Sequence, residues 1–284
     1  MSEGEESMKT PKTLYTLIAV FCMFAIIAGV YAQFIEGGTR NSGSSGNVNV
    51  ITGEKDRETV KAEFNDLFTN TINLNGRDTT GITKLKADQE IIYALDKTES
   101  TDAYEIDIHV PVVNIKSDVA SSFNKVTQAV FANKANEVLK KTDVTTKTLY
   151  NIDYVAYVNE DILSVVIKST LKEGQSAQRV IVQTYNYNLS TGAEVKLNEL
   201  VTKKALNKDE VNSKIKSVVQ EADNESKLVA SAGYNEVFSR DLNSSMYTVD
   251  NSGTFFLGDS QKLYIIYAYG NQNFTSEMDI VLFE

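Results

Sequence analysis

The chain has 284 residues, 42% of them hydrophobic, and a formal net charge of −10. That length is enough for one large or two modest domains, and an acidic chain without a basic patch excludes nucleic acid as a partner class. With one cysteine, Cys22, and one histidine, His109, the sequence excludes an intrachain disulfide and the usual thiolate or imidazole metal sites, so we expect no metal and no cofactor.

An uncharged apolar run begins at Leu14 and ends at Phe34 (residues 14–34). As a helix it is long enough to cross a hydrocarbon core of roughly 30 Å, and no polar face interrupts it. Lys9 and Lys12 precede the run. The positive-inside rule therefore predicts a single-pass protein of the cell membrane, with residues 1–13 as a short cytoplasmic tail and the rest of the chain outside.

A cleaved signal peptide is the alternative interpretation, because Val30-Tyr31-Ala32 has small residues at the spacing that a signal peptidase prefers. Cleavage would then follow Ala32. The run is longer than the usual signal core of roughly 7–15 residues, which favours a retained anchor. Residues 35–53 come next, rich in Gly, Ser and Asn, and are predicted to be a flexible linker.

The predicted folded region, residues 54–284, begins with a helix that Asp56 caps. A loop is predicted over residues 72–83, followed by strands over residues 90–97 and 103–114. Pro111 in the second strand indicates an edge position or a strand end. In the helix that Asp56 caps, the apolar residues recur at helical spacing; they are Val60, Phe64, Leu67 and Phe68.

A long helix follows, capped by Ser117, and two strands come after it. The strands are predicted over residues 148–158 and 162–171, and the turn composition of Asn159-Glu160-Asp161 joins them in a meander. The buried stripe of the helix is predicted to be Val119, Phe123, Val126 and Val130.

The next segment, QTYNYNLSTGAEVKLNEL at residues 183–200, predicts a half-buried hairpin. Gly192 suits the left-handed position that its three-residue loop needs. Glu194 and Lys196 are expected to point towards water. Strand alternation places two sets of residues on buried faces: Tyr185, Tyr187 and Leu189 in the first arm, and Ala193, Val195 and Leu197 in the second.

The last part of the chain contains a third helix and three strands. Asn207 is the expected N-cap of this helix, and Glu210 is expected to complete a capping box. The buried stripe is predicted to be Val211, Ile215, Val218 and Ala222. The strands are predicted over residues 254–257, 262–269 and 279–283. KLYIIYAY, in the second of them, is apolar on both faces and predicts a central strand that is covered on both sides.

The irregular order of helices and hairpins predicts an α+β fold with antiparallel sheets and packed helices. Within residues 54–284 we distinguish an N-terminal part, approximately residues 54–175, and a C-terminal part, residues 176–284.

The order of these pieces carries a family resemblance. It runs from VPVVNIKSDVASSFNKVTQAV through YNIDYVAYVNEDILSVVIKSTL to QTYNYNLSTGAEVKLNELV, and it closes with LYIIYAYGNQNFTSEMDIVLF. Over roughly residues 85–284 the chain resembles the extracytoplasmic domain shared by the anti-sigma-V factor RsiV and the non-catalytic N-terminal region of the peptidoglycan deacetylase PdaC. The resemblance implies an envelope-facing module that binds a ligand or a partner.

Two departures limit what the resemblance implies. Members of the family often carry Gly-Gly-Ala-His in the loop before the hairpin, whereas the loop KEGQSAQ at residues 172–178 has no histidine. About a dozen residues precede Leu14, and a segment of that length buries too little surface for a stable interface with a sigma factor. We therefore do not expect anti-sigma activity.

Among the residues that carry chemistry, His109 falls on the wet face of its strand with Glu105 and Asp107. A solvated or locally paired histidine is the more frequent case, so we favour it over a catalytic histidine or a weak cation site with these two carboxylates. The sequence has no Walker loop, Rossmann fingerprint or Gly-x-Ser-x-Gly elbow. In the strand that contains His109, the opposite face is predicted to be buried and to carry Tyr104, Ile106, Ile108 and Val110.

The expected function is that of a non-enzymatic, membrane-anchored binding or sensing module of the cell envelope. The alternatives are a cell-wall-acting enzyme that uses paired carboxylates and a structural envelope protein. The candidate contact region is the loop at residues 172–178. Glu173, Gln175 and Arg179 are the residues expected to touch an envelope protein or a cell-wall ligand, although a solvated connector is the more frequent role of such a loop.

Overall fold

The computed structural model describes residues 55–233, 238–273 and 275–284, which belong to one compact unit, Ile51–Glu284. The apolar run at residues 14–34 and the predicted linker lie outside the described residues. Within the described ranges, no helix combines the length and the apolar character needed to cross a bilayer. The helices and strands are α2 (Arg57–Asn65), β1 (Ile72–Asn73), β2 (Ile92–Ser100), β3 (Tyr104–Val113), α3 (Asp118–Thr127), η1 (Gln128–Ala132), α4 (Asn133–Val138), β4 (Thr148–Asn159), β5 (Ile162–Glu173), β6 (Arg179–Asn188), α5 (Leu197–Lys203), α6 (Lys208–Ser231), β7 (Phe255–Leu257), η2 (Asp259–Gln261), β8 (Leu263–Ala268), α7 (Gly270–Asn273) and β9 (Met278–Phe283).

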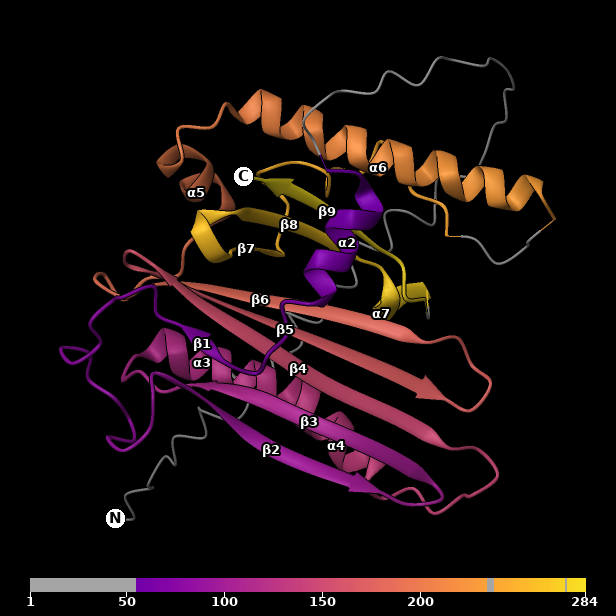
Figure 1. Ribbon diagram of the computed structural model, residues 1–284, viewed down its shortest axis with the longest axis horizontal. Helices are drawn as coiled ribbons and strands as arrows, with labels where there is room; N and C mark the ends of the chain where they lie inside the picture. The colour runs from indigo at the N-terminus through magenta and orange to yellow at the C-terminus, as the bar shows by residue number, and fades with distance from the viewer. Residues whose placement is uncertain (1–54, 234–237, 274) are drawn as a thin grey trace, which may run out of the picture. The chain divides into compact units, whose positions relative to one another are not determined.

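The larger of two sheets has the strand order β2-β3-β4-β5-β6, and β1 adds to β4 (Figure 1). The predicted α+β class is confirmed, but the sheet is mixed rather than antiparallel. β3 and β4 run parallel, because α3, η1 and α4 form the crossover that returns the chain to the starting end of β3. β3 stays beside β4 only up to the pair Ile108–Ile152, and β1 takes over the same edge of β4 at Ala156. Pro111 lies three residues past that pair, where β3 is still paired with β2 but no longer with β4, so it has the edge position that was one of the two predicted possibilities.

One face of the large sheet carries the first core, beneath the helical segment α3–η1–α4. Phe123 and Phe131 of this segment pack against Ile106, Ile152 and Ile167 of the sheet. The N-cap Ser117 is confirmed, because its Oγ accepts from the amides of the first turn.

The predicted stripe of this helical segment is wrong in its second half. Val130 is 43% exposed, and Phe131 is buried in its place. The difference begins before the π-helical turn Gln128–Ala132, because Thr127 is 0% exposed whereas Val126 is only partly buried, and the buried side chains continue from Thr127 at helical spacing. The residues that line the observed buried face are Ala120, Phe123, Thr127, Phe131, Ala135 and Val138.

The second sheet is antiparallel, with the order β7-β8-β9, and it has a core on each face. One face packs on the large sheet together with α2, and Phe256 stacks there between Tyr157 and Tyr264 at ring-centroid distances of 6.2 and 4.6 Å. The other face packs under α5 and α6, and α6 runs along it in Figure 1. The predicted central and doubly covered strand is confirmed as β8. The N-caps Asp56 and Asn207 are confirmed as well.

The outer edge of β7 is closed by side chains of the large sheet. The Leu257 amide donates to Ser164 Oγ at 3.1 Å, and Ser164 Oγ donates to Asn186 Oδ1 at 2.6 Å. Asn186 Nδ2 donates to the Phe255 carbonyl at 2.8 Å, and the Phe255 amide donates to Thr184 Oγ1 at 3.0 Å. An edge strand exposes unpaired backbone groups, and here buried polar side chains satisfy them. The two sheets are therefore joined by hydrogen bonds as well as by apolar packing.

The predicted hairpin is correct in its turn and too long in its second arm. Gly192 has a φ of +73°, and Tyr185 and Tyr187 are buried in the first core. The second arm, however, consists of a single bridge between Tyr187 and Glu194, after which α5 begins at Leu197. Val195 and Leu197 pack in the core under α5 and α6, whereas Ala193 is exposed, because the chain turns away from β6 instead of continuing along it. β6 itself pairs along its whole length with β5.

Candidate functional site

The face of the large sheet that points away from α3 and α4 is divided into two halves. The second sheet and α2 bury one half, which we call the covered half; its residues include Val155, Tyr157, Ser164, Val166, Val182, Thr184 and Asn186. The other half is exposed or partly exposed, and we call it the open half; its residues are Asp96, Thr98, Ser100, Glu105, Asp107, His109, Leu149, Asn151, Thr170 and Lys172. Strand register places each set on the same side of the sheet.

The acidic side of the open half lies on β2 and β3. His109 Nδ1 lies 2.7 Å from Asp96 Oδ1, and His109 Nε2 lies 3.4 Å from Asp107 Oδ1. Asp96 and Asp107 keep 63% and 55% of their side chains exposed. His109 therefore pairs locally with carboxylates on the wet face, where the sequence placed it. In the part of the chain that the structure describes, no three His, Cys, Asp or Glu side chains are arranged to hold a metal ion.

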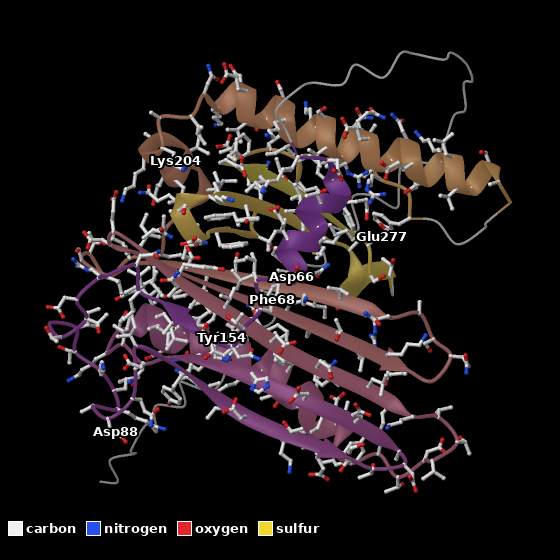
Figure 2. All side chains as sticks on the ribbon, viewed as in Figure 1. Asp66, Phe68, Asp88, Tyr154, Lys204 and Glu277 are labelled. Atoms are coloured by element: carbon white, nitrogen blue, oxygen red, sulfur yellow. The ribbon has the colours of Figure 1, made fainter. Side chains whose placement is uncertain are left out.

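The border between the two halves is formed by Lys168 beneath the end of α2. Its Nζ lies 4.3 Å from the ring centre of Phe68 and donates to Asn65 Oδ1 at 3.2 Å. Burial lowers the pKa of Lys168, although the nearby carboxylates act in the opposite direction. Figure 2 labels Phe68 between α2 and the large sheet. On the open side of this border, Asp153 Oδ1 accepts from Asn70 Nδ2 at 3.0 Å.

In the candidate contact loop, residues 172–178, Glu173 forms two ion pairs. Glu173 accepts from Lys141 at 2.7 Å and from Arg179 at 2.6 Å, which ties the end of α4 to β5 and β6. The hydrogen bond from Lys141 is the main reason that the pKa of Glu173 lies below its usual value, while partial burial opposes the shift. The structure thus brings Glu173 and Arg179 together, and it leaves Gln175 exposed on the loop. Their role in binding stays a prediction.

A buried charged cluster, which sequence reasoning missed, fixes the segment after α6 to β9. Arg240 donates to both carboxylate oxygens of Asp279, at 2.6 and 2.7 Å, and their side chains are 1% and 0% exposed. Tyr269 Oη donates to Asp279 Oδ2 at 2.8 Å and lies 3.0 Å from Tyr247 Oη. Burial tends to lower the pKa of Arg240, but its bonds to Asp279 outweigh that and raise it. Arg240 also donates to Ser226 Oγ, so its guanidinium group links the segment after α6 to both α6 and β9.

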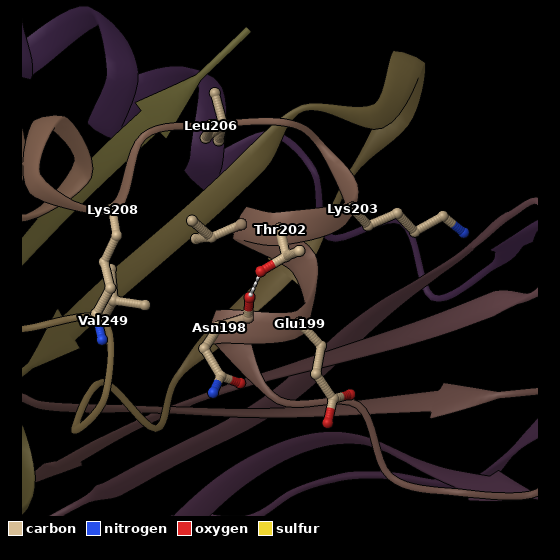
Figure 3. A pocket seen from close by; sticks show the side chains of 8 residues that line it. Asn198, Glu199, Thr202, Lys203, Leu206, Lys208 and Val249 are labelled. Atoms are coloured by element: carbon tan, nitrogen blue, oxygen red, sulfur yellow. Dashed lines mark hydrogen bonds between the residues drawn. The ribbon is translucent and has the colours of Figure 1, made fainter.

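A surface cavity of about 570 Å³ lies between α5, the start of α6 and Val249 (Figure 3). Glu199 is the one acidic residue in its lining, so this cavity does not supply the two facing carboxylates that glycoside hydrolysis requires. Its two lysines are paired, Lys203 with Glu160 at 2.8 Å and Lys208 with Asp250 at 2.7 Å. The cavity gives no support to the enzymatic alternative, and the non-enzymatic assignment stays a prediction.

Comparison with known proteins gives similar structures but no similar sequences. No family model matches the chain, and no curated protein matches it significantly. The similar solved structures include a DUF3298 family protein from Pseudomonas aeruginosa PAO1, with 10% identity and a TM-score of 0.38, covering 68% of this chain and 90% of that one. A DUF3298 family member from Bacteroides fragilis NCTC 9343 has 12% identity and a TM-score of 0.33, covering 62% and 82%.

DUF3298 is the domain found in RsiV and in the N-terminal region of PdaC. At TM-scores below 0.5 the structural likeness carries no argument about this chain. Membership of the family stays a prediction.

Proposed function

We propose that this protein is a non-enzymatic binding module of the cell envelope and that its partner docks on the open half of the large sheet. The observation that carries the proposal is the open half itself. Polar side chains of four neighbouring strands lie there in register, on a sheet whose opposite face is buried beneath α3 and α4. A binding surface gains from such a rigid support, because little side-chain and backbone freedom is lost when the partner docks.

A solvated sheet face is common in antiparallel proteins, so composition must separate a binding face from a merely wet one. The open half has carboxylates on β2 and β3 and a lysine, Lys172, on β5, with the 40% exposed Leu149 between them. Separated charges of both signs around an apolar residue can orient a polar partner. The partner that fits is an envelope protein or a cell-wall ligand with complementary charge and an apolar group.

The N-terminal sequence supports a location in the cell membrane. We propose that residues 14–34 anchor the protein in the cell membrane and that residues 35–53 link the anchor to the folded unit outside the cell. In cell fractionation the full chain should stay with membranes after high-salt washing. A form released into the medium and beginning near Gln33 would replace the anchor with a cleaved signal peptide.

Binding can be tested with the unit Ile51–Glu284 as bait in an envelope extract. The variant Asp96→Asn, Asp107→Asn changes two exposed carboxylates of the open half, and the matched control Asp88→Asn, Asp102→Asn changes two exposed carboxylates in loops. We expect the first variant to retain at least about tenfold less partner, corresponding to 1.4 kcal/mol, and the control to retain as much as the unmodified bait. Equal retention by both variants removes the open half as the docking face.

The enzymatic alternative has a separate readout. Turnover of peptidoglycan fragments by the purified unit, abolished by one Asp or Glu substitution, contradicts a non-enzymatic binder.

A further inference from the structure

The two edges of the large sheet differ in how they are closed. At one edge, the Val180 amide of β6 donates to the Thr275 carbonyl at 3.3 Å. Gly270 lies so close to β6 that a Cβ at this position would be 2.1 Å from the Val180 carbonyl oxygen. The chain segment after β8 therefore covers the β6 edge. At the other edge, among the described residues, β2 has backbone partners on β3 alone.

The β2 edge carries three charged side chains, Asp96, Lys97 and Glu99, but it lacks the backbone devices that usually keep an edge strand unpaired. Its register with β3 continues without a bulge from Ile92 to Ser100, and it contains no proline. Leu95, near its middle, is 45% exposed. A regular edge with an exposed large apolar residue is a template for another strand, because its outward amides and carbonyls are already aligned.

We propose that β2 pairs with β2 of a second copy of this chain, antiparallel and with Leu95 opposite Leu95. A two-fold axis perpendicular to the sheet relates two such strands, so the residue at the axis faces its own copy. The registers with the longest overlap place Leu95, Asp96 or Lys97 at the axis. Like charges directly opposite each other destabilise a strand pair, which disfavours Asp96 and Lys97.

The Leu95 register also makes the neighbouring pairs compatible. Tyr93 lies opposite Lys97 of the second copy, once on each side of the axis. Because Lys97 Nζ is paired with Glu99 at 2.6 Å and Lys86 Nζ lies 4.8 Å from the Tyr93 ring centre, it is the apolar stem of Lys97 that packs along the ring. Ala94 lies opposite Asp96, whose carboxylate points to the open side of the sheet. The two open halves then lie on the same side of one continuous sheet. This dimer does not depend on the proposed binding function.

Disulfide trapping of the full-length chain in its membrane tests the register. In a Cys22→Ser background, Leu95→Cys places two thiols in opposite residues whose Cα atoms are about 4.5–5.5 Å apart, within disulfide range. The matched control is Thr98→Cys, on the same exposed edge strand, where the proposed register separates the two thiols by about 20 Å. Mild oxidation should give a covalent dimer from the Leu95→Cys chain and none from the Thr98→Cys chain, with equal maleimide labelling of both before oxidation.

Three results contradict the proposal. A Thr98 dimer in place of a Leu95 dimer excludes the register, and monomers from both chains with reactive thiols exclude the pairing. A Leu95→Cys thiol that is protected from maleimide in a monomer shows that a segment of the same chain, or another protein, occupies the edge. As an independent measurement, light scattering of the unmodified full-length chain in detergent should give the mass of a dimer, and Leu95→Lys should give that of a monomer.

Discussion

The covered and open halves of the large sheet belong to the same face of one sheet, and two strands, β4 and β5, contribute residues to both. β4 crosses both. From Thr148 to Asp153 its residues alternate between buried and exposed, and from Tyr154 to Asn159 every residue is buried. β5 shows the same change in reverse order, from a continuously buried start to an alternating end. The place where alternation stops along a strand is therefore the place where the second sheet begins.

A single strand can therefore carry the sequence patterns of two environments, one after the other. TLYNID in β4 has the pattern of a strand with one wet face, and YVAYVN has the pattern of a strand covered on both faces. We therefore expect substitutions in the covered half to have large effects on stability and substitutions in the open half to have small ones.

The largest expected effect is that of Phe256→Ala, in the strand β7 that packs on the covered half. Phe256 is 0% exposed and lies between the rings of Tyr157 and Tyr264, so its removal leaves a cavity between the two sheets. We expect a loss of about 3–5 kcal/mol in the free energy of unfolding, measured by urea titration of the unit Ile51–Glu284. The matched change in the open half, Asn151→Ala, should alter it by less than about 0.5 kcal/mol. Losses of equal size would erase the distinction between the halves.

A smaller effect is expected for Ser164→Ala, which removes the hydroxyl between the two sheets. The Leu257 amide and Asn186 Oδ1 then lose a hydrogen-bond partner in a buried place. Such a loss costs about 1–3 kcal/mol, and chemical denaturation at neutral pH measures it. Thr170→Ala, on the same strand but in the open half, serves as the control. If Ser164→Ala is as mild as the control, the polar side chains under β7 do not join the sheets in solution.

The smallest effect, and the one that depends on pH, is expected for Glu173→Gln at the far end of β5. The pKa of Glu173 is lowered in the folded protein, so its ion pairs add stability above the pKa of the unfolded chain and lose it as the pH falls through the folded pKa. The side chain is 31% exposed, and solvent screening limits the effect to about 0.2–1 kcal/mol at pH 7. Stability curves of the variant and the unmodified unit should converge in acid. A gap that widens as the pH falls would contradict the sign.

Local signals in the sequence predict much of the fold. The N-caps Asp56, Ser117 and Asn207, the left-handed Gly192 and the doubly apolar β8 each depend on neighbouring residues alone. The parallel β3–β4 pair and the π-turn at Gln128–Ala132 depend on packing between distant segments, which no short pattern records. The sequence-based prediction missed both features, and it also made the second arm of the hairpin too long.

The sequence predicted the candidate surface only in part. Alternation placed Glu105, Asp107 and His109 on a wet face, but it did not show that Asp96 of β2 lies opposite His109. The change of pattern along β4 was a readable signal for the open half. The buried pair of Arg240 and Asp279 had no such signal, because the two residues lie 39 positions apart and approach through tertiary structure.

The contact between α2 and β9 has a consequence for the order in which the protein is made. Phe64 of α2 packs against Phe256 and Tyr264, and Arg57 lies 3.5 Å from Asp279 of β9. The ribosome produces α2 early and β9 more than two hundred residues later in the chain. Until then, the covered half of the large sheet lacks part of its cover, and chains in this state aggregate or are degraded more readily than finished ones. A nascent chain that stalls before β9 is therefore a natural substrate for chaperones and quality-control proteases.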